Sequence, residues 1–263
     1  MNGGGFTGKT VWVTGAETPV GRAVAELFYE EGASLLLSGV SSADLPGNGC
    51  ECICYADNPI NEEHAGRAVS LIDRLDVAVA ANRYVKRGSL IEGTAGLFDE
   101  MMEQNLFHAF CAARAAAGKM GKTGGGAVLF INSIHGEKPT GSAPFYSVAC
   151  GGVNMLVKEA AQDFGRLGIR VNQLKCGPLA GDEELFFSDK SGIYHGAAAR
   201  VPRGALGTPR EIARAALFLC SDAASFINGA ALTADGGFLG FYMHGDSERR
   251  WDIGYADKGT ANG

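Results

Sequence analysis

Residues 10–28 read TVWVTGAETPVGRAVAELF, and this stretch decides the fold. Its first four residues are β-branched or aromatic, which is typical of a strand. A turn with Gly15 and Gly21 follows, and Val20, Val24 and Leu27 then recur at helical spacing. The stretch therefore predicts a strand, a tight glycine-containing turn and a helix.

The same alternation continues along the chain. Apolar runs predict further strands at 34–38, 52–55, 76–80, 127–131, 169–174 and 230–233, and amphipathic stretches predict helices at 62–75, 98–120, 146–165 and 209–220. Strands that alternate with helices form parallel sheets covered on both faces. We therefore expect a single doubly wound α/β domain with a mostly parallel seven-stranded sheet.

Composition excludes several classes of protein. Hydrophobic residues make up 46% of the 263 residues, enough for a large core, so the chain is not expected to be disordered. The formal net charge of −6 offers no basic excess for nucleic acid or an anionic membrane. The chain has no apolar run of about 18 residues and no apolar signal core near Met1, so we expect neither a membrane span nor secretion.

Seven cysteines, an odd number without a secretion signal, indicate reduced thiols in the cytoplasm. Cys50, Cys52 and Cys54 alternate and would share one face of a strand. A metal site there is the weaker interpretation, because strands rarely present tetrahedral ligands at this spacing and no histidine lies close by. We expect buried strand cysteines and no metal.

Two regions lie outside the strand and helix alternation. Residues 179–205 form a long connection that suggests a lid, and residues 241–263 form a polar tail. The expected organisation is thus one domain over 1–240, with its lid, and a C-terminal tail.

Several motifs occur in an order that resembles the short-chain dehydrogenase/reductase family, from about residue 7 to 240. Thr14 to Gly21 is similar to that family's glycine turn, and Ser133 and Tyr146 have its serine-to-tyrosine spacing. The stretch 207–237 is similar to its last helix and strand. The resemblance implies a Rossmann-like fold, a nicotinamide cofactor, hydride transfer between alcohol and carbonyl, and dimers or tetramers built on the helices at 98–120 and 146–165.

The resemblance also assigns residues. It implies that Asn105, Ser133 and Tyr146 correspond to catalytic positions. It likewise implies that Gly15, Gly21 and Asp57 correspond to cofactor-binding positions. In the family, a lysine four residues after the tyrosine lowers the pKa of that tyrosine and holds the nicotinamide ribose.

Four departures lie along the path of the cofactor. Cys150 stands at the lysine position, and a neutral thiol supplies none of the roughly 4 kcal/mol needed to bring a tyrosine pKa from 10 to about 7. Pro19 replaces the middle glycine of the turn, two residues after the acidic Glu17. Gly39 stands where an acidic residue would hold the ribose. Arg83 replaces a glycine after the fourth strand.

These departures suggest a retained scaffold that binds no cofactor. The leading hypothesis is a non-catalytic subunit of a heteromeric alcohol or hydroxyacyl-CoA-type dehydrogenase, paired with a homologous short-chain dehydrogenase subunit that binds NAD(P). Two alternatives stay open. One is a cofactor-independent serine/tyrosine enzyme related to halohydrin dehalogenases, and the other is an active NAD(P)-dependent oxidoreductase in which Lys175 or Arg83 replaces the missing cation.

Overall fold

β1 (Thr10–Thr14) lies inside a sheet of seven parallel strands with the order β3-β2-β1-β4-β5-β6-β7. The computed structural model describes residues 5–43, 49–58, 61–180, 198 and 201–240. The other strands are β2 (Ser34–Ser38), β3 (Cys52–Tyr55), β4 (Val77–Ala80), β5 (Gly126–Ser133), β6 (Ile169–Cys176) and β7 (Ala231–Ala234). The predicted fold is confirmed, with every strand pairing parallel.

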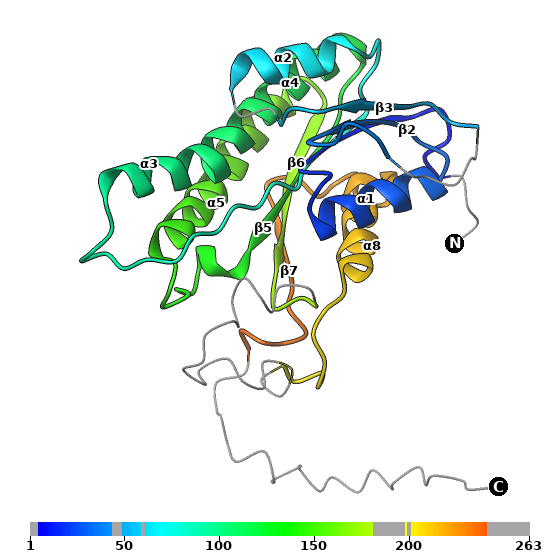
Figure 1. Cartoon of the computed structure of the whole chain (residues 1–263). Coiled ribbons are helices and arrows are strands. Elements are labelled where there is room, and N and C mark those ends of the chain that lie inside the picture. Colours follow the sequence, from blue (N-terminus) through cyan, green and yellow to red (C-terminus); the bar gives the residue numbers. More distant parts are fainter. Residues whose placement is uncertain (1–4, 44–48, 59–60, 181–197, 199–200, 241–263) are drawn as a thin grey trace, which may run out of the picture.

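Helices cover both faces of this sheet (Figure 1). On one face lie α1 (Pro19–Glu30) and α8 (Pro209–Cys220), and on the other lie α2 (Glu62–Ser70), α4 (His108–Thr123) and α5 (Pro144–Gly165). The faces alternate along each strand, so Val11 and Val13 pack with α1 and α8. Trp12 points the other way, and its indole Nε1 donates to Ser38 Oγ at 2.9 Å. Both faces are apolar, as expected for a parallel sheet.

The long helix predicted over 98–120 is interrupted. It consists of α3 (Ala95–Met102), a π-helical segment over Glu103–Phe107, and α4. The Asn105 amide nitrogen donates to the carbonyls of Met101 at 3.0 Å and Tyr84 at 2.9 Å, and its oxygen accepts from the Tyr84 N–H at 3.0 Å. The side chain therefore ties the π segment to the loop after β4, which apolar periodicity alone does not reveal.

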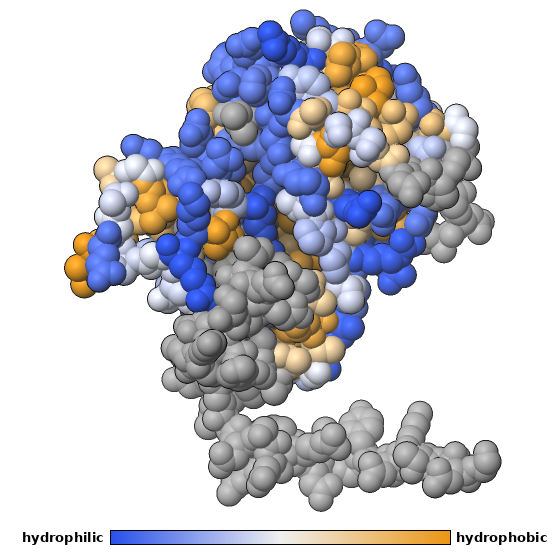
Figure 2. Space-filling view, viewed as in Figure 1, coloured by the Kyte–Doolittle hydropathy of each residue, from blue (hydrophilic) through white to orange (hydrophobic). Residues whose placement is uncertain are grey.

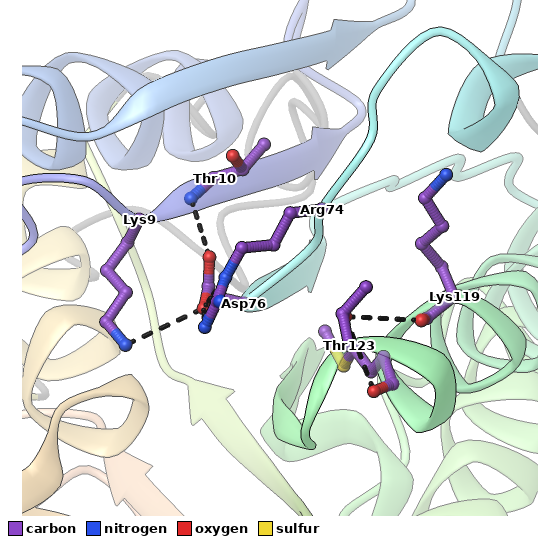
Figure 3. Close-up of polar contacts among 7 residues, drawn as sticks. Lys9, Thr10, Arg74, Asp76, Lys119 and Thr123 are labelled. Carbon is purple, nitrogen blue, oxygen red and sulfur yellow. Dashed lines mark hydrogen bonds and ion pairs between the residues drawn. The ribbon is translucent and has the colours of Figure 1, made fainter.

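Asp76 fixes the amino ends of β1 and β4 (Figure 3). Its carboxylate accepts from the Thr10 N–H at 2.9 Å and from Arg74 Nη2 at 2.7 Å, and Lys9 Nζ lies 3.6 Å away. Burial raises the pKa of this carboxyl, but Arg74, the Thr10 N–H and Lys9 together hold it below its usual value. At the end of α4, Figure 3 also shows the Thr123 hydroxyl donating to the Lys119 carbonyl.

The viewed surface is mostly hydrophilic, with apolar residues in separate patches (Figure 2). None of the helices in the described part of the chain is long and apolar enough to span a membrane. Most of the predicted lid, 181–197 and 199–200, and the whole tail, 241–263, lie outside the described residues.

Candidate active site

A cavity of about 190 Å³ opens at the carboxyl ends of the strands. It extends from the turn after β1, where Thr18 and Pro19 line it, to Ser133 at the end of β5 and Tyr146 in α5. The strand order reverses between β1 and β4, and ligands of open α/β sheets bind at such switch points. Ser133 and Tyr146, both predicted from sequence, thus meet in the place where this architecture binds ligands.

Tyr146 is 4% exposed and carries its phenol at the cavity. Burial raises the pKa of this phenol well above its usual value, and Cys150 raises it further. The positive charge of Arg83 and a hydrogen bond with the Ser133 hydroxyl act in the opposite direction and lower the pKa. Tyr146 is therefore a protonated, hydrogen-bonded phenol at neutral pH.

Cys150 lies one helical turn after Tyr146 and is 3% exposed. Burial raises the pKa of its thiol to about 12, so the group at the lysine position is neutral. Arg83 supplies a nearby positive charge instead. It lines the same cavity and lowers the pKa values of both Tyr146 and Cys150.

Lys175, the other candidate cation, is committed elsewhere. The residue is 6% exposed, and its ammonium group pairs with the Glu137 carboxylate. His135 lies beside Tyr146, with the ring centroids 6.4 Å apart, and its Nδ1 is 3.1 Å from the Lys138 carbonyl. Burial and Arg83 lower the pKa of His135, although the Lys138 contact raises it.

Two residues of the interrupted helix made of α3, the π-helical segment and α4 border the cavity. Asn105 was predicted, and it lies in the π-helical segment, a distortion that recurs at functional sites. His108 was missed by the sequence reasoning, because a histidine on an apolar helix face carries no signal of its own. It is 1% exposed, its Nε2 has no hydrogen-bond partner among the described residues, and burial lowers its pKa to about 3.

The glycine turn keeps the backbone that a dinucleotide needs. Gly15 has a φ of +67°, and a Cβ there would lie 2.6 Å from the Asn82 nitrogen. A Cβ on Gly21 would lie 2.1 Å from the Gly15 oxygen. Pro19 is the first residue of α1, where the missing N–H costs no intrahelical hydrogen bond and the fixed φ suits the helix.

The residues present therefore fit a dinucleotide. The helix N-terminus at Pro19 and Val20 faces the cavity, and its positive dipole end favours a pyrophosphate. Asp57 follows the carboxyl end of β3 and is exposed to solvent. Gly39 has no side chain, but the carboxylate of Glu17 lies against it.

This fold, with a serine and a tyrosine at its switch point, is typical of α/β oxidoreductases that bind dinucleotides. Residues 15–239 match a family model described as enoyl-(acyl carrier protein) reductase. Cis-4-hydroxycyclohexanecarboxylate dehydrogenase of Sinomonas cyclohexanicum is 32% identical over 90% of this chain and 98% of its own. The chain belongs to the short-chain dehydrogenase/reductase family.

A further curated relative and two solved structures are also similar to this chain along most of its length. L-rhamnose 1-dehydrogenase (NAD(P)(+)) of Sphingomonas sp. strain SKA58 is 29% identical over 88% of this chain and 96% of its own. A putative gluconate dehydrogenase from Agrobacterium tumefaciens has a TM-score of 0.80 at 27% identity, covering 89% and 97% of the two chains. L-sorbose reductase from Gluconobacter frateurii, solved with NADPH and L-sorbose, shares the fold with a TM-score of 0.78 at 24% identity, over 90% and 98%.

Two predictions from the sequence are wrong. The comparisons contradict a non-catalytic subunit, because the relatives are named as dehydrogenases and reductases. They also contradict a chain that binds no cofactor, because a relative aligned over almost its full length is named for NAD(P)⁺. The physical error was to treat Pro19 and Gly39 as losses, although Pro19 fits the start of α1 and Glu17 fills the place beside Gly39.

Proposed function

We propose that this chain is an active NAD(P)-dependent oxidoreductase that interconverts a secondary alcohol and its ketone. One observation carries the proposal: a single cavity brings Ser133, Tyr146 and Arg83 together with the first turn of α1. The α1 N-terminus and the glycine turn would hold the dinucleotide. When bound, that cofactor accepts or donates the hydride.

Tyr146 moves the proton in this proposal. Its phenol donates a proton to the carbonyl oxygen during reduction, and the phenolate accepts one from the alcohol during oxidation. The Ser133 hydroxyl orients the substrate oxygen and hydrogen-bonds Tyr146. Arg83 is the cation that stabilises the phenolate, taking over this part of the role of the family's lysine.

The substrate proposed is a ring-bearing alcohol, or the corresponding ketone. Two relatives named for hydroxycyclohexanecarboxylate and rhamnose support this choice. A 3-oxoacyl thioester is the competing class, since a further relative is named as a 3-oxoacyl-[acyl-carrier-protein] reductase.

The test begins with binding and then follows absorbance of the reduced cofactor with cyclohexanols, aldoses and a 3-oxoacyl thioester. We expect saturable binding of NAD or NADP and turnover of a ring alcohol or ketone. The Arg83→Met variant should lose at least about tenfold in kcat for oxidation, because the phenolate loses its cation. Arg87→Met, in the same loop but exposed, should keep the native kcat. If neither dinucleotide binds at millimolar concentration, the proposal is wrong.

A further inference from the structure

A carboxylate lies at the end of β2, although β2 itself ends without an acidic residue. In dinucleotide-binding sheets an acidic side chain near this point hydrogen-bonds the adenosine ribose. Here the position is Gly39, with a φ of +93°. The Glu17 carboxylate oxygen Oε2 lies 2.1 Å from the point where a Cβ on Gly39 would be. Glu17 thus places its charge where a β2 side chain would begin.

Glu17 is held in this place by the neighbouring turn. Its Oε1 accepts from Asn58 Nδ2 at 2.9 Å, and Asn58 Oδ1 accepts from the Gly15 N–H at 3.1 Å. The chain of contacts therefore links the glycine turn, the segment after β3 and the end of β2. Glu17 is exposed, and within the described ranges its Oε2 makes no hydrogen bond, so that oxygen can accept from a ligand.

The position of the Glu17 carboxylate depends on the glycine at residue 39. A Cβ at residue 39 would displace the Oε2 atom from this position, and it would also lie 2.8 Å from Asn58 Nδ2. The absence of a side chain at the end of β2 is what leaves room for the carboxylate from the first turn. The two changes that look like separate losses in the sequence form one arrangement in space.

We propose that Glu17 replaces the missing acid of β2, binds the adenosine ribose hydroxyls and selects NAD over NADP. The inference rests on the proposed function. A carboxylate accepts from two vicinal hydroxyls, whereas the 2′-phosphate of NADP would meet a like charge. Residues 39–43 contain no arginine or lysine that would neutralise such a phosphate.

The experiment measures dissociation constants for NAD and NADP by calorimetry, without substrate. Three variants are compared with the native chain: Glu17→Gln, Glu17→Arg and, as a matched control, Glu63→Gln. Glu63 is an exposed glutamate on α2, whose carboxylate pairs with Arg67. Thermal melts check that each variant folds, which is expected because Glu17 is on the surface.

The native chain should bind NAD at least about tenfold more tightly than NADP. Glu17→Gln should weaken NAD binding by about tenfold through the loss of a charged acceptor. Glu17→Arg should improve NADP binding by at least about tenfold. Glu63→Gln should leave both constants unchanged.

The outcomes separate the two ideas. If neither dinucleotide binds the native chain, the proposed function fails. If NAD binds and Glu17→Gln behaves like Glu63→Gln, the proposed function stands and the role of Glu17 is wrong. Tighter NAD binding by Glu17→Gln would also overturn the inference, since Glu17 would then obstruct the ribose.

Discussion

Burial around the phenol of Tyr146 favours one direction of the proposed reaction. Its pKa is raised, so the proton donor for carbonyl reduction is present throughout the neutral range. Alcohol oxidation needs the phenolate, which is scarce at neutral pH. The oxidation rate should therefore rise with pH into the alkaline range while the reduction rate stays nearly constant from pH 6 to about 9.

Cys150→Lys should move the oxidation profile toward neutral pH. An ammonium within the same cavity lowers the pKa of a neighbouring acid by about one to three units. The pH at half-maximal kcat for oxidation should fall by at least about one unit, as measured with the preferred alcohol.

Cys150→Met is the matched control, because it fills the same buried position without a charge. The pH at half-maximal kcat for oxidation should stay in the alkaline range in this variant. Identical profiles for the two variants would mean that the group titrating in oxidation is not Tyr146.

At the residue scale, the family resemblance located the candidate catalytic side chains but not the groups that compensate for the departures. The family resemblance implies a lysine at Cys150 and an acid at Gly39, and the sequence shows that both are absent. That Glu17 reaches Gly39 from the first turn depends on the pairing of β1 with β2, a contact in space that a linear motif does not contain. Arg83 was one of two candidate cations, and only the structure separates it from Lys175.

At the scale of elements, the apolar runs predicted every strand, both the buried β4 and the partly buried or exposed β3 and β7. β2, β3 and α8 have the predicted bounds. The helix predicted over 62–75 ends instead at Ser70, and the helix over 98–120 is interrupted by the π segment around Asn105. The π segment is accompanied by the hydrogen bonds of the Asn105 amide, which the apolar pattern does not reveal.

Asp76→Asn should loosen the junction of β1 and β4. The variant keeps the size of the side chain but removes the charge that Arg74 and Lys9 pair with. We expect the free energy of unfolding at pH 7 to fall by about 1–3 kcal/mol in urea titrations. Asp73→Asn, an exposed neighbour, should change it by less than about 0.5 kcal/mol.

The pH dependence gives a second measurement of the same carboxylate. The pKa of Asp76 is lower in the folded chain, so its contribution to stability is present above the unfolded pKa and is lost as the pH falls through the folded one. The gap between native and Asp76→Asn stability should therefore close in acid. A gap that stays constant down to pH 2 would contradict a role for the charge.

At the scale of the whole molecule, the two long helices leave apolar side chains uncovered. Phe107 and Phe110 stack with centroids 6.1 Å apart and are 43% and 37% exposed, and Met155 on α5 is 54% exposed. Val157 is fully buried and packs against the sheet, and Leu156 is partly buried, so neither belongs to this exposed face. The uncovered face is therefore formed by Phe107, Phe110 and Met155.

We expect a second copy of this chain to cover that face, as the family resemblance implies. Light scattering should give the mass of a dimer or tetramer for the native chain, and the Phe110→Glu variant should show a smaller mass. Leu71→Glu, which changes an exposed residue at the end of α2, is the control and should leave the mass unchanged. A native chain that stays monomeric would refute assembly through this face.

The contact between α1 and α8 has a consequence for synthesis. The Arg210 guanidinium pairs with the Glu30 carboxylate, 180 positions earlier in the chain. At about 5–20 residues per second, a ribosome needs about 10–40 seconds to make the second helix after the first. Throughout that interval the apolar side of α1 has no partner helix, so the nascent chain is most open to aggregation, and to chaperones, before residues 209–220 emerge.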